Sequence, residues 1–317
     1  MARRICGVDI GGTKCALTIG EVGADGIKIL DKVKFATPKR DPEGTISRFF
    51  AELDVRFGKY SVESVGISCG GPLDIDRGII LSPPGLPGWD DVHIVDAFKK
   101  RYGVPCAIQN DANACALAEW RYGAGKGSRN MVFLTFGTGL GAGIIIDGKL
   151  YSGTNGMAGE AGHIRLERFG PVGYGKGGSF EGFCSGAGIA ELGRAKAKEL
   201  MQVGRYASYC PDGNLDSINA KVIADCAENG CDDAAEIYRI SGEYLGKGLA
   251  VLIDILNPEV IVIGSVFARS ENLLRPSMEA ALRRETLPHS LAACTVRPAA
   301  LGDSVGDFAA IAVGDEG

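Results

Sequence analysis

Short apolar runs that end in glycine dominate the first half of the chain. Residues 5–10 form one such run, the turn Gly11-Gly12-Thr13-Lys14 follows it, and residues 15–20 form a second apolar run. This pattern predicts a strand, a tight turn and a returning strand. The same order recurs over residues 130–146, around Gly137-Thr138-Gly139-Leu140-Gly141. The recurrence predicts two related α/β halves.

The rest of the chain alternates between strand-like and helix-like patterns. Further strands are expected over residues 27–35, 62–68, 104–108 and 258–264, with a hairpin over 74–82. Helical spacing of apolar residues predicts helices that start at residue 42 and that cover 95–102, 189–200, 217–228, 233–256 and 308–313. Residues 83–89 are rich in proline and glycine and are expected to be irregular. An α/β fold class follows.

One junction between a predicted strand and a predicted helix carries a carboxylate. Asp111 follows the apolar run 104–108 and precedes an alanine-rich helical stretch, with Asn110 and Asn113 beside it. Ligands of open α/β sheets bind at the carboxyl ends of strands, where such a carboxylate could take a proton from an alcohol and the amides could grip hydroxyls. Asp and Asn most often cap helices at such places, so these residues alone favour a cap.

Composition and charge exclude several classes of protein. The chain has 317 residues, a length typical of about two domains, and 45% of them are hydrophobic. The formal net charge of −5 gives no general attraction to nucleic acid or to anionic membranes. No apolar stretch approaches the ~18 residues of a membrane helix, and no signal sequence is recognisable, so a cytoplasmic protein is expected.

The ten cysteines have no Cys-x-x-Cys spacing, and most lie in apolar segments. Buried free thiols in a reducing compartment are therefore expected. Cys210, Cys226 and Cys231 come nearest to a cluster, but no histidine lies near them in the sequence, which argues against a metal site there.

The two glycine turns suggest phosphate binding. Successive backbone N–H groups in a glycine turn form a concavity for anions, and Thr13 and Thr138 add hydroxyl donors. Neither turn is a Gly-x-x-x-x-Gly-Lys-Ser/Thr loop, and the Gly137 turn leads into a strand rather than into the helix of a dinucleotide fingerprint. With Asp9 beside the first turn, the pair suggests loops that hold the phosphates of a nucleotide and Mg²⁺.

The motifs together resemble the ROK family (repressors, open reading frames, kinases) of sugar kinases. The resemblance extends from residue 5 to about residue 313, and it rests on five segments in order: residues 9–14, 110–113, 137–141, 159–163 and 256–264. It implies the actin-like ATPase (ribonuclease H-like) fold, with two α/β domains around a central cleft. The domains would be residues 1–120, completed by a C-terminal helix at about 300–317, and residues 121–299.

The resemblance also implies roles for individual residues. Asp111 would be the general base of an ATP-dependent hexose kinase that most often acts on the 6-hydroxyl. Contacts to the sugar would come from Gly71, Asn110, Asp111, Glu160, His163 and Glu181. Contacts to ATP would come from Asp9, Gly11, Gly12, Thr13, Lys14, Gly137, Thr138, Gly139 and Gly264, with Mg²⁺ near Asp9. The bland interpretation of His163 is a packed, hydrogen-bonded histidine.

The sequence departs from the family pattern at three places. Family members carry three cysteines that hold a structural zinc with the histidine of Glu-x-Gly-His, and here Val172, Tyr174 and Ser179 replace them, so no zinc is expected. Gly85 stands where the family commonly has Asn before Leu-Pro-Gly-Trp, which leaves glucose specificity open. Ser265 replaces the second glycine of a usual Gly-Gly.

Three functions fit these residues. The first is a kinase acting on glucose, fructose, mannose, N-acetylmannosamine, N-acetylglucosamine or a β-glucoside, as a homodimer or homotetramer. The second is a sugar-responsive repressor, which is disfavoured because the first phosphate turn begins at Gly11 and leaves no room for a helix-turn-helix region, and because the chain is acidic. The third is a sugar-binding protein without catalysis, and the intact Asn110-Asp111 pair argues against it.

Overall fold

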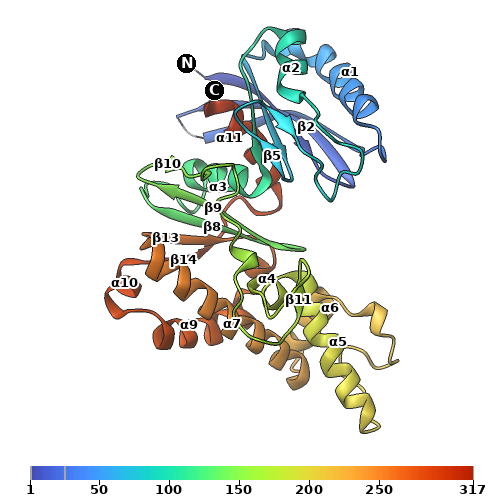
Figure 1. Cartoon of the computed structure of the whole chain (residues 1–317), viewed down its shortest axis with the longest axis vertical. Helices are drawn as coiled ribbons and strands as arrows, with labels where there is room; N and C mark the ends of the chain where they lie inside the picture. The colour runs from blue at the N-terminus through green and yellow to red at the C-terminus, as the bar shows by residue number, and fades with distance from the viewer. Residues whose placement is uncertain (1, 25, 317) are drawn as a thin grey trace. The chain divides into compact units, whose positions relative to one another are not determined.

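The computed structural model describes residues 2–24 and 26–316 and has mixed sheets and helices, as the sequence predicts (Figure 1). The strands are β1 Arg3–Ile10, β2 Lys14–Gly23, β3 Gly26–Ala36, β4 Ser64–Cys69, β5 Leu73–Asp74, β6 Ile79–Ile80, β7 Cys106–Asn110, β8 Met131–Phe136, β9 Leu140–Ile146, β10 Lys149–Leu150, β11 Val172–Gly173, β12 Lys176–Gly177, β13 Val260–Ile263 and β14 Thr295–Pro298. The α-helices are α1 Pro42–Tyr60, α2 Ile94–Tyr102, α3 Asp111–Tyr122, α4 Phe180–Phe183, α5 Gly186–Gln202, α6 Ala220–Glu228, α7 Asp232–Leu256, α8 Val266–Arg269, α9 Glu271–Glu285, α10 Pro288–Ala293 and α11 Val305–Glu316.

Contacts between residues divide the chain into two compact units. Unit 1 contains residues 1–129, 143–159 and 300–317, and unit 2 contains residues 130–142 and 160–299. The C-terminal helix α11 therefore belongs with the N-terminal strands; in Figure 1 it is the red helix among the blue elements. The chain passes from unit 2 to unit 1 within β9. The domain limits expected from the sequence stay a prediction. Their outermost residues, 1 and 317, lie outside the described residues.

The five-stranded sheet of unit 1 has the order β3-β2-β1-β4-β7. β1 and β2 form the predicted antiparallel hairpin, and β1, β4 and β7 run parallel to one another. The register pairs Ile10 with Cys69 and Cys69 with Asn110. The carboxyl ends of the three parallel strands therefore meet at one edge of the sheet, which is where ligands bind in open α/β sheets.

Helices cover both faces of this sheet because its central strands are apolar on both sides. β4 is buried at every position, and Val65 and Ile67 are 0% exposed. The helix α11 packs against β1 and β4, where Gly66 and Gly314 lie so close that a Cβ on either would overlap the backbone of the other. Phe49 of α1 and Phe98 of α2 lie in the large cluster of buried hydrophobic side chains of this unit, together with Leu17 and Ile67. The burial of these side chains supplies the main driving force for folding.

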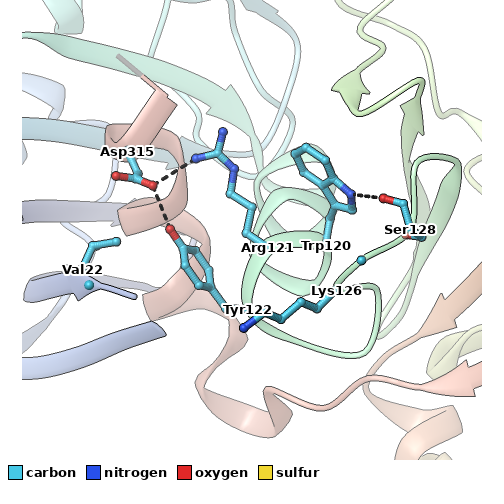
Figure 2. A pocket seen from close by; sticks show the side chains of 9 residues that line it. Val22, Trp120, Arg121, Tyr122, Lys126, Ser128 and Asp315 are labelled. Atoms are coloured by element: carbon cyan, nitrogen blue, oxygen red, sulfur yellow. Dashed lines mark hydrogen bonds and ion pairs between the residues drawn. The ribbon is translucent and has the colours of Figure 1, made fainter. Parts of the chain in front are cut away.

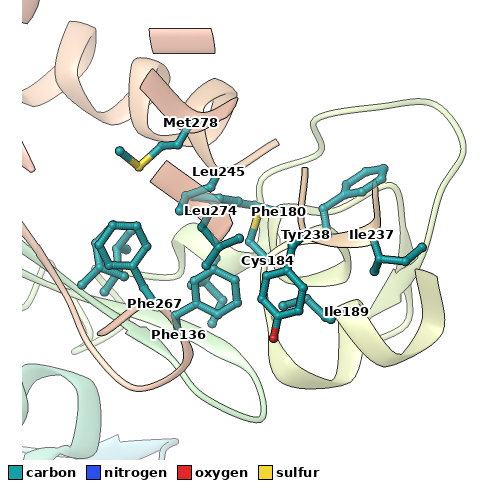
Figure 3. Close-up of a cluster of buried hydrophobic side chains, with 14 of the residues drawn as sticks. Phe136, Phe180, Cys184, Ile189, Ile237, Tyr238, Leu245, Phe267, Leu274 and Met278 are labelled. Carbon is teal, nitrogen blue, oxygen red and sulfur yellow. The ribbon is translucent and has the colours of Figure 1, made fainter. Parts of the chain in front are cut away.

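Unit 2 is built around the parallel strands β8, β13 and β14 and the long helix α7. Its core collects Phe136 of β8, Phe180 of α4, Tyr238 and Leu245 of α7 and Met278 of α9 (Figure 3). α7 and α9 pack side by side along much of their length. Phe183 also stacks on Tyr244 with ring centroids 3.6 Å apart, which fixes the short helix α4 to α7.

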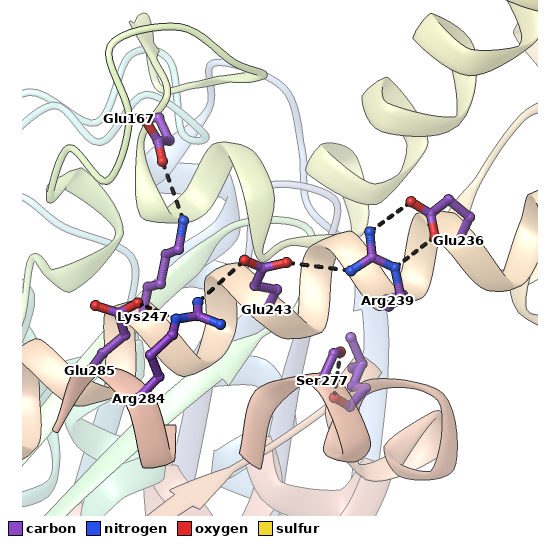
Figure 4. A network of polar contacts seen from close by, with 9 residues as sticks. Glu167, Glu236, Arg239, Glu243, Lys247, Ser277, Arg284 and Glu285 are labelled. Atoms are coloured by element: carbon purple, nitrogen blue, oxygen red, sulfur yellow. Dashed lines mark hydrogen bonds and ion pairs between the residues drawn. The ribbon is translucent and has the colours of Figure 1, made fainter. Parts of the chain in front are cut away.

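Ion pairs line the outer surface of α7 and α9 (Figure 4). Arg239 binds Glu236 and Glu243 of its own helix, and Glu243 also pairs with Arg284 of α9 at 3.4 Å. These side chains are partly exposed, so each pair contributes only ~0.2–1 kcal/mol to stability. The network orders the surface but does not determine the packing of the two helices.

Most of the elements expected from the sequence are present. The short elements β11, β12 and α4 were not expected, and the longest omission lies between residues 264 and 300. No helix was expected over α8, α9 and α10, and no strand at β14. α9 contains Pro276, a residue that usually ends a helix. Pro276 is the sixth residue of α9, so the helix lacks the hydrogen bond that an N–H at this position would donate to the carbonyl of Asn272. β14 is short and alternates between half-buried and exposed positions, so its apolar signal is weak.

Candidate functional site

Asp111 is the first residue of α3 and directly follows β7. Asn110 is the N-cap, and its Oδ1 accepts the N–H of Ala112 at 3.0 Å; Oδ1 of Asp111 accepts the same N–H at 2.8 Å. The capping interpretation is therefore correct for Asn110, and Asp111 shares in it. Capping does not remove Asp111 from chemistry, because the residue remains exposed to solvent.

The surroundings of Asp111 favour the protonated form of its carboxyl group. Desolvation by the surrounding protein raises its pKa, and the hydrogen bond from the N–H of Ala112 opposes that rise. A carboxylate with a raised pKa is a better proton acceptor than an ordinary surface aspartate, since a base is most effective when its pKa lies near the working pH. The side chain thus combines exposure with increased basicity.

Asn113 does not share this exposure, so the expectation that its amide grips hydroxyls is wrong. Asn113 is 1% exposed, and its Nδ2 donates to Oε1 of Gln109 at 3.2 Å. The same Gln109 oxygen accepts the N–H of Asn110 at 2.9 Å. Asn113 is a buried residue in the first turn of α3, and its bond to Gln109 of β7 links the helix to the strand before it.

Asp9 lies on β1, in the row of residues paired with Ser68 of β4, and is only partly exposed. Burial, and then the charges of Asp111 and Asp307, raise its pKa to about 7, against the opposing effect of Lys34 and Lys32. Two carboxylates near each other in one site cannot both ionise at their ordinary pKa. Asp9 and Asp111 are therefore electrostatically coupled, as expected for neighbours at one sheet edge.

Asp307 was not expected from the sequence. It lies in the first turn of α11, is 8% exposed, and accepts hydrogen bonds from Thr18 Oγ1 at 3.3 Å and from Lys32 Nζ. The neighbouring Gly306 approaches Asp9 so closely that a Cβ there would lie 3.6 Å from Oδ2 of Asp9. No local pattern connects a residue near the C-terminus with strands β1 to β3, and only the fold brings them together.

The first glycine turn has little room for side chains. The N–H of Gly11 donates to the carbonyl of Lys14 at 3.2 Å, and the hydroxyl of Thr37 donates to the carbonyl of Gly11 at 2.6 Å. A Cβ on Gly12 would lie 2.4 Å from the carbonyl oxygen of Gly85, so Gly12 is required by the loop that rests on it. Thr13 and Lys14 are exposed and accessible to a ligand.

Gly71, which follows β4, completes the group in unit 1. A Cβ on Gly71 would lie 3.3 Å from Nδ2 of Asn110, so the backbone of this turn lies beside the expected sugar contact. Unit 1 thus brings together at one edge of its sheet the residues that the sequence assigned to the base, to two of the sugar contacts and to the first phosphate turn.

Unit 2 holds the second glycine turn, and its backbone is fixed from two sides. The carbonyl of Gly137 accepts the N–H of Gly186 at 2.7 Å, which ties the turn to the start of α5. Oε2 of Glu181 accepts the N–H of Leu140 at 2.9 Å, and a Cβ on Gly139 would lie 2.6 Å from the same oxygen. The expected sugar contact Glu181 and the expected phosphate contact Gly139 are thus direct neighbours.

Ser185 is a further residue that the sequence analysis missed in unit 2. Its hydroxyl caps α5 by accepting the N–H of Gly188 at 2.9 Å. A serine directly before a helical pattern is a typical N-cap signal and could have been found. Its cap sets the direction of the helix end that holds the Gly137 turn.

Glu160 directly precedes the short helix η1 Ala161–His163, His163 is its last residue, and both side chains are exposed. The imidazole of His163 meets the ring of Tyr174 edge to face, with centroids 6.3 Å apart. Because the His163 ring is exposed, the alternative interpretation of His163 as a packed core histidine is wrong. Gly264, expected near the adenosine, directly follows β13 and is buried beside Phe133.

The segment that replaces the family's zinc loop is held by hydrogen bonds. The strands β11 and β12 pair, Nζ of Lys176 donates to the carbonyl of His163 at 2.7 Å, and Arg165 donates to the carbonyl of Gly177 at 2.7 Å. The hydroxyl of Ser179 caps α4 through the N–H of Gly182. Val172, Tyr174 and Ser179 offer no thiolate, so this donor set does not fit zinc.

Among residues 2–24 and 26–316, no group of three or more His, Cys, Asp and Glu side chains is arranged to hold a metal ion. Asp9 fits a different mode, in which Mg²⁺ is bound by one carboxylate together with substrate phosphates. Its raised pKa shows that a positive charge beside it would relieve an unfavourable charge. No helix in the described part of the chain is long and apolar enough to cross a membrane.

A separate surface cavity of about 450 Å³ lies in unit 1, at the C-terminal end of α3 (Figure 2). Trp120, Arg121, Tyr122 and Lys126 line it, together with Asp315 of α11. Arg121 and the hydroxyl of Tyr122 both donate to Asp315, at 3.0 and 2.8 Å. The cavity lies at the opposite end of α3 from Asp111, so it is not the site described above.

Comparison with known proteins agrees with this geometry. The sequence model described as the ROK family matches residues 5–314. The chain belongs to the ROK family. The family therefore covers both units and every candidate residue from Asp9 to Gly264, and the family prediction made from the motifs is confirmed.

Three similar proteins illustrate the range of the family. A glucokinase from Streptomyces coelicolor is 33% identical over 279 residues, covering 88% of this chain and 86% of that protein. A ROK family glucokinase from Streptomyces griseus, solved with glucose and AMPPNP, is 33% identical, with a TM-score of 0.77 over 99% of this chain and all of that one. A ROK family transcriptional regulator, homologous to the Escherichia coli Mlc protein, is 26% identical, with a TM-score of 0.85 over 98% of this chain and 77% of that one.

These structures confirm the predicted fold, which is the actin-like ATPase fold of the ROK glucokinases. The ROK family member therefore shares its architecture with both kinases and regulators. Fold likeness does not separate the two activities, since function depends on the site rather than on the fold.

Proposed function

We propose that this ROK protein is an ATP-dependent kinase that phosphorylates a hexose or a hexose derivative. The expected acceptor is the 6-hydroxyl. The observation that carries the proposal is the exposed Asp111 directly after β7, whose last residue is in register with the ends of β1 and β4 at Ile10 and Cys69. Likeness to glucokinases and to a structure with glucose and AMPPNP supports the choice of substrates.

In this proposal Asp111 is the general base. Its carboxylate takes the proton of the sugar hydroxyl while the hydroxyl oxygen forms a bond to the γ-phosphorus of ATP, and the bond from that phosphorus to the bridging oxygen of ADP breaks. Asn110, Gly71, Glu160, His163 and Glu181 hold the sugar. Phosphoryl transfer requires positioning and charge stabilisation more than covalent catalysis, so these contacts and one base suffice.

The phosphates of ATP are held by backbone N–H groups and hydroxyls of the glycine turns. The contacts come from Gly11, Gly12, Thr13, Lys14, Gly137, Thr138 and Gly139, with Gly264 beside the adenosine. Mg²⁺ bound with ATP near Asp9 supplies charge neutralisation on the phosphate oxygens. The surroundings of Asp9 disfavour its ionised form in the free protein, and a bound cation would stabilise that form.

A coupled assay of ADP release tests the proposal directly. The panel contains glucose, fructose, mannose, N-acetylglucosamine, N-acetylmannosamine and a β-glucoside, each with and without ATP and Mg²⁺. We expect saturable turnover on at least one sugar. Folded protein that releases no ADP with any of them contradicts the kinase proposal. Size-exclusion chromatography with light scattering tests the expected homodimer or homotetramer.

A sugar-binding regulator is the second candidate, because a ROK transcriptional regulator superimposes over 98% of this chain. Calorimetric titration with the same sugars separates it from the kinase. Binding without turnover, together with a sugar-dependent gel shift on DNA at low salt, favours the regulator. The net charge of −5 is a reason to expect no DNA binding.

A further inference from the structure

The turn between α6 and α7 brings two cysteines together. The N–H of Cys231 donates to the carbonyl of Cys226 at 3.2 Å, and the N–H of Gly230 donates to the carbonyl of Ala227 at 3.0 Å. Gly230 has a φ of +86°, in the left-handed region. These two bonds and the left-handed glycine define a Schellman motif at the end of α6.

In a Schellman motif one of the two hydrogen bonds spans six residues. The first and last of these residues face each other, and apolar side chains often meet there. Both positions are cysteines in this chain. Burial, followed by the side-chain hydrogen bond of Cys226 to Cys231, raises the pKa of Cys226 to about 12. Both residues are half-buried, so reagents in solution can reach them, whereas Cys6, Cys69 and Cys184 are fully buried.

We propose that Cys226 and Cys231 form a reversible disulfide site that is oxidised by hydroperoxides and reduced by dithiols. A disulfide requires Cα atoms about 4.4–6.8 Å apart. The 3.2 Å hydrogen bond from the N–H of Cys231 to the carbonyl of Cys226 holds the backbones of the two cysteines next to each other. The proposal is independent of the kinase function, because it concerns only the α6–α7 turn of unit 2.

Cys231 is the first thiol to react. The raised pKa of Cys226 leaves little of that thiol as thiolate, so Cys226 is the poorer first nucleophile. The sulfur of Cys231 displaces alcohol or water from the hydroperoxide and becomes a sulfenic acid. The sulfur of Cys226 then attacks that sulfur and water leaves. In total, the two thiols lose two protons and two electrons and become a disulfide. The hydroperoxide takes up these protons and electrons and becomes an alcohol (or water) and a water molecule.

The test uses the full chain and peptide mapping by mass spectrometry. The protein is treated with hydrogen peroxide, alkylated with iodoacetamide and digested with trypsin. Both cysteines fall in one tryptic peptide, residues 222–239, because no Lys or Arg lies between Lys221 and Arg239. We expect this peptide to lose two hydrogens and both alkylation sites, and to regain both sites after treatment with dithiothreitol.

The half-buried Cys115 and Cys294 are internal controls, since they are comparably accessible but no described cysteine is paired with either through a Schellman turn. We expect both to remain alkylated when the 222–239 peptide is already oxidised. Alkylation of Cys226 and Cys231 at the same level as the two controls overturns the proposal. Sulfinic acid at Cys231 in place of a disulfide also overturns it.

Two glycine substitutions separate the geometry from the mere presence of two thiols. Gly230→Ala strains the turn by about 1 kcal/mol, so disulfide formation should slow about fivefold. Gly204→Ala is the matched control: α5 ends in the same motif, with Gly204 at a φ of +74° and hydrogen bonds from Arg205 to Leu200 and from Gly204 to Met201. Equal rates in the two variants would show that the turn does not bring the thiols together, and would overturn the proposal.

Discussion

Glu181 accepts a hydrogen bond from the backbone N–H of Leu140, with 2.9 Å between Oε2 and the nitrogen. The side chain expected to bind the sugar is therefore already part of the support of the second glycine turn. The two roles are compatible, since a carboxylate has two oxygens and can accept several hydrogen bonds. A substitution at Glu181 should consequently affect the turn as well as the sugar contact.

Glu181→Ala leaves the N–H of Leu140, a residue that is 5% exposed, without its acceptor. An unsatisfied buried N–H costs about 1–3 kcal/mol, so urea unfolding should show a loss of stability of that order. Glu181→Gln keeps an oxygen that can accept the bond and should lose less. Equal stability of the two variants would show that the bond does not support the turn.

Asp111→Asn should abolish most of the proposed kinase activity. The amide cannot accept a proton, and general-base catalysis contributes typically ~10²–10⁴-fold in rate. The cap at Ala112 should survive because the amide oxygen can still accept that N–H, so the fold and sugar affinity should change little. The measurement is kcat by ADP release beside sugar binding by calorimetry. Asp225→Asn, at an exposed position on α6, is the control, and a fully active Asp111→Asn variant removes Asp111 from the role of base.

Gly12→Ala should impair the first glycine turn. The new Cβ would lie 2.4 Å from the carbonyl oxygen of Gly85, a separation that real Cβ atoms do not show, so the turn or the 83–89 loop must move. We expect the KM for ATP to rise about tenfold or more, since displaced backbone donors lose charge-assisted hydrogen bonds to phosphate. Gly85→Ala is the matched control because no atom lies within 4 Å of its added Cβ. An unchanged KM in Gly12→Ala would place the phosphates elsewhere.

Gly85→Asn restores the side chain common in the family, and the open space at Gly85 accommodates it. We expect a folded protein with an altered order of kcat/KM over the hexose panel, because the amide adds a donor and an acceptor beside the first glycine turn. A hydrogen bond of this kind is worth about 0.5–1.5 kcal/mol, or roughly two- to twelvefold in relative kcat/KM. Identical preferences in wild type and variant would show that this loop does not contact the sugar.

Asp9 makes stability depend on pH in the opposite direction from an ordinary salt-bridged aspartate. Its pKa rises from 3.8 to about 7 on folding, so between these values the folded state keeps a proton that the unfolded state has lost. The contribution of Asp9 to stability therefore falls as the pH rises through this window. The total change is at most ~4 kcal/mol, since one pKa unit corresponds to about 1.4 kcal/mol.

Asp9→Asn removes this titration. Urea unfolding should show the variant gaining stability relative to the wild type as the pH rises from about 4 to about 7, with no further gain above that. Asp31→Asn, a partly exposed residue on β3, is a control for general effects of charge. A stability difference between Asp9→Asn and wild type that stays constant across this range would contradict the raised pKa.

The sequence predicted the strand-to-helix junction at Asp111 and both glycine turns, because each is a local pattern of apolar run, glycine and capping residue. It did not predict Asp307 beside Asp9, since 298 positions separate them (307 minus 9) and only the pairing of α11 with β1 brings them together. It did not predict α9 because Pro276 interrupts the helical signal. Asn113 was misjudged because sequence spacing alone does not tell the inner from the outer face of a short helix.

Glu119 shows a further consequence of where α3 lies in the chain. This carboxylate is 0% exposed and accepts the N–H groups of Ala124, Ala300 and Leu301, at 2.8, 3.1 and 2.8 Å. The backbone that departs toward Asn130 and the backbone that arrives from Ala299 are thus both tethered to the helix that begins with Asp111. A single buried carboxylate therefore holds both the segment that leaves α3 toward Asn130 and the segment that follows Ala299. Replacing Glu119 would remove the hydrogen bonds of both segments at once, even if each unit still folded.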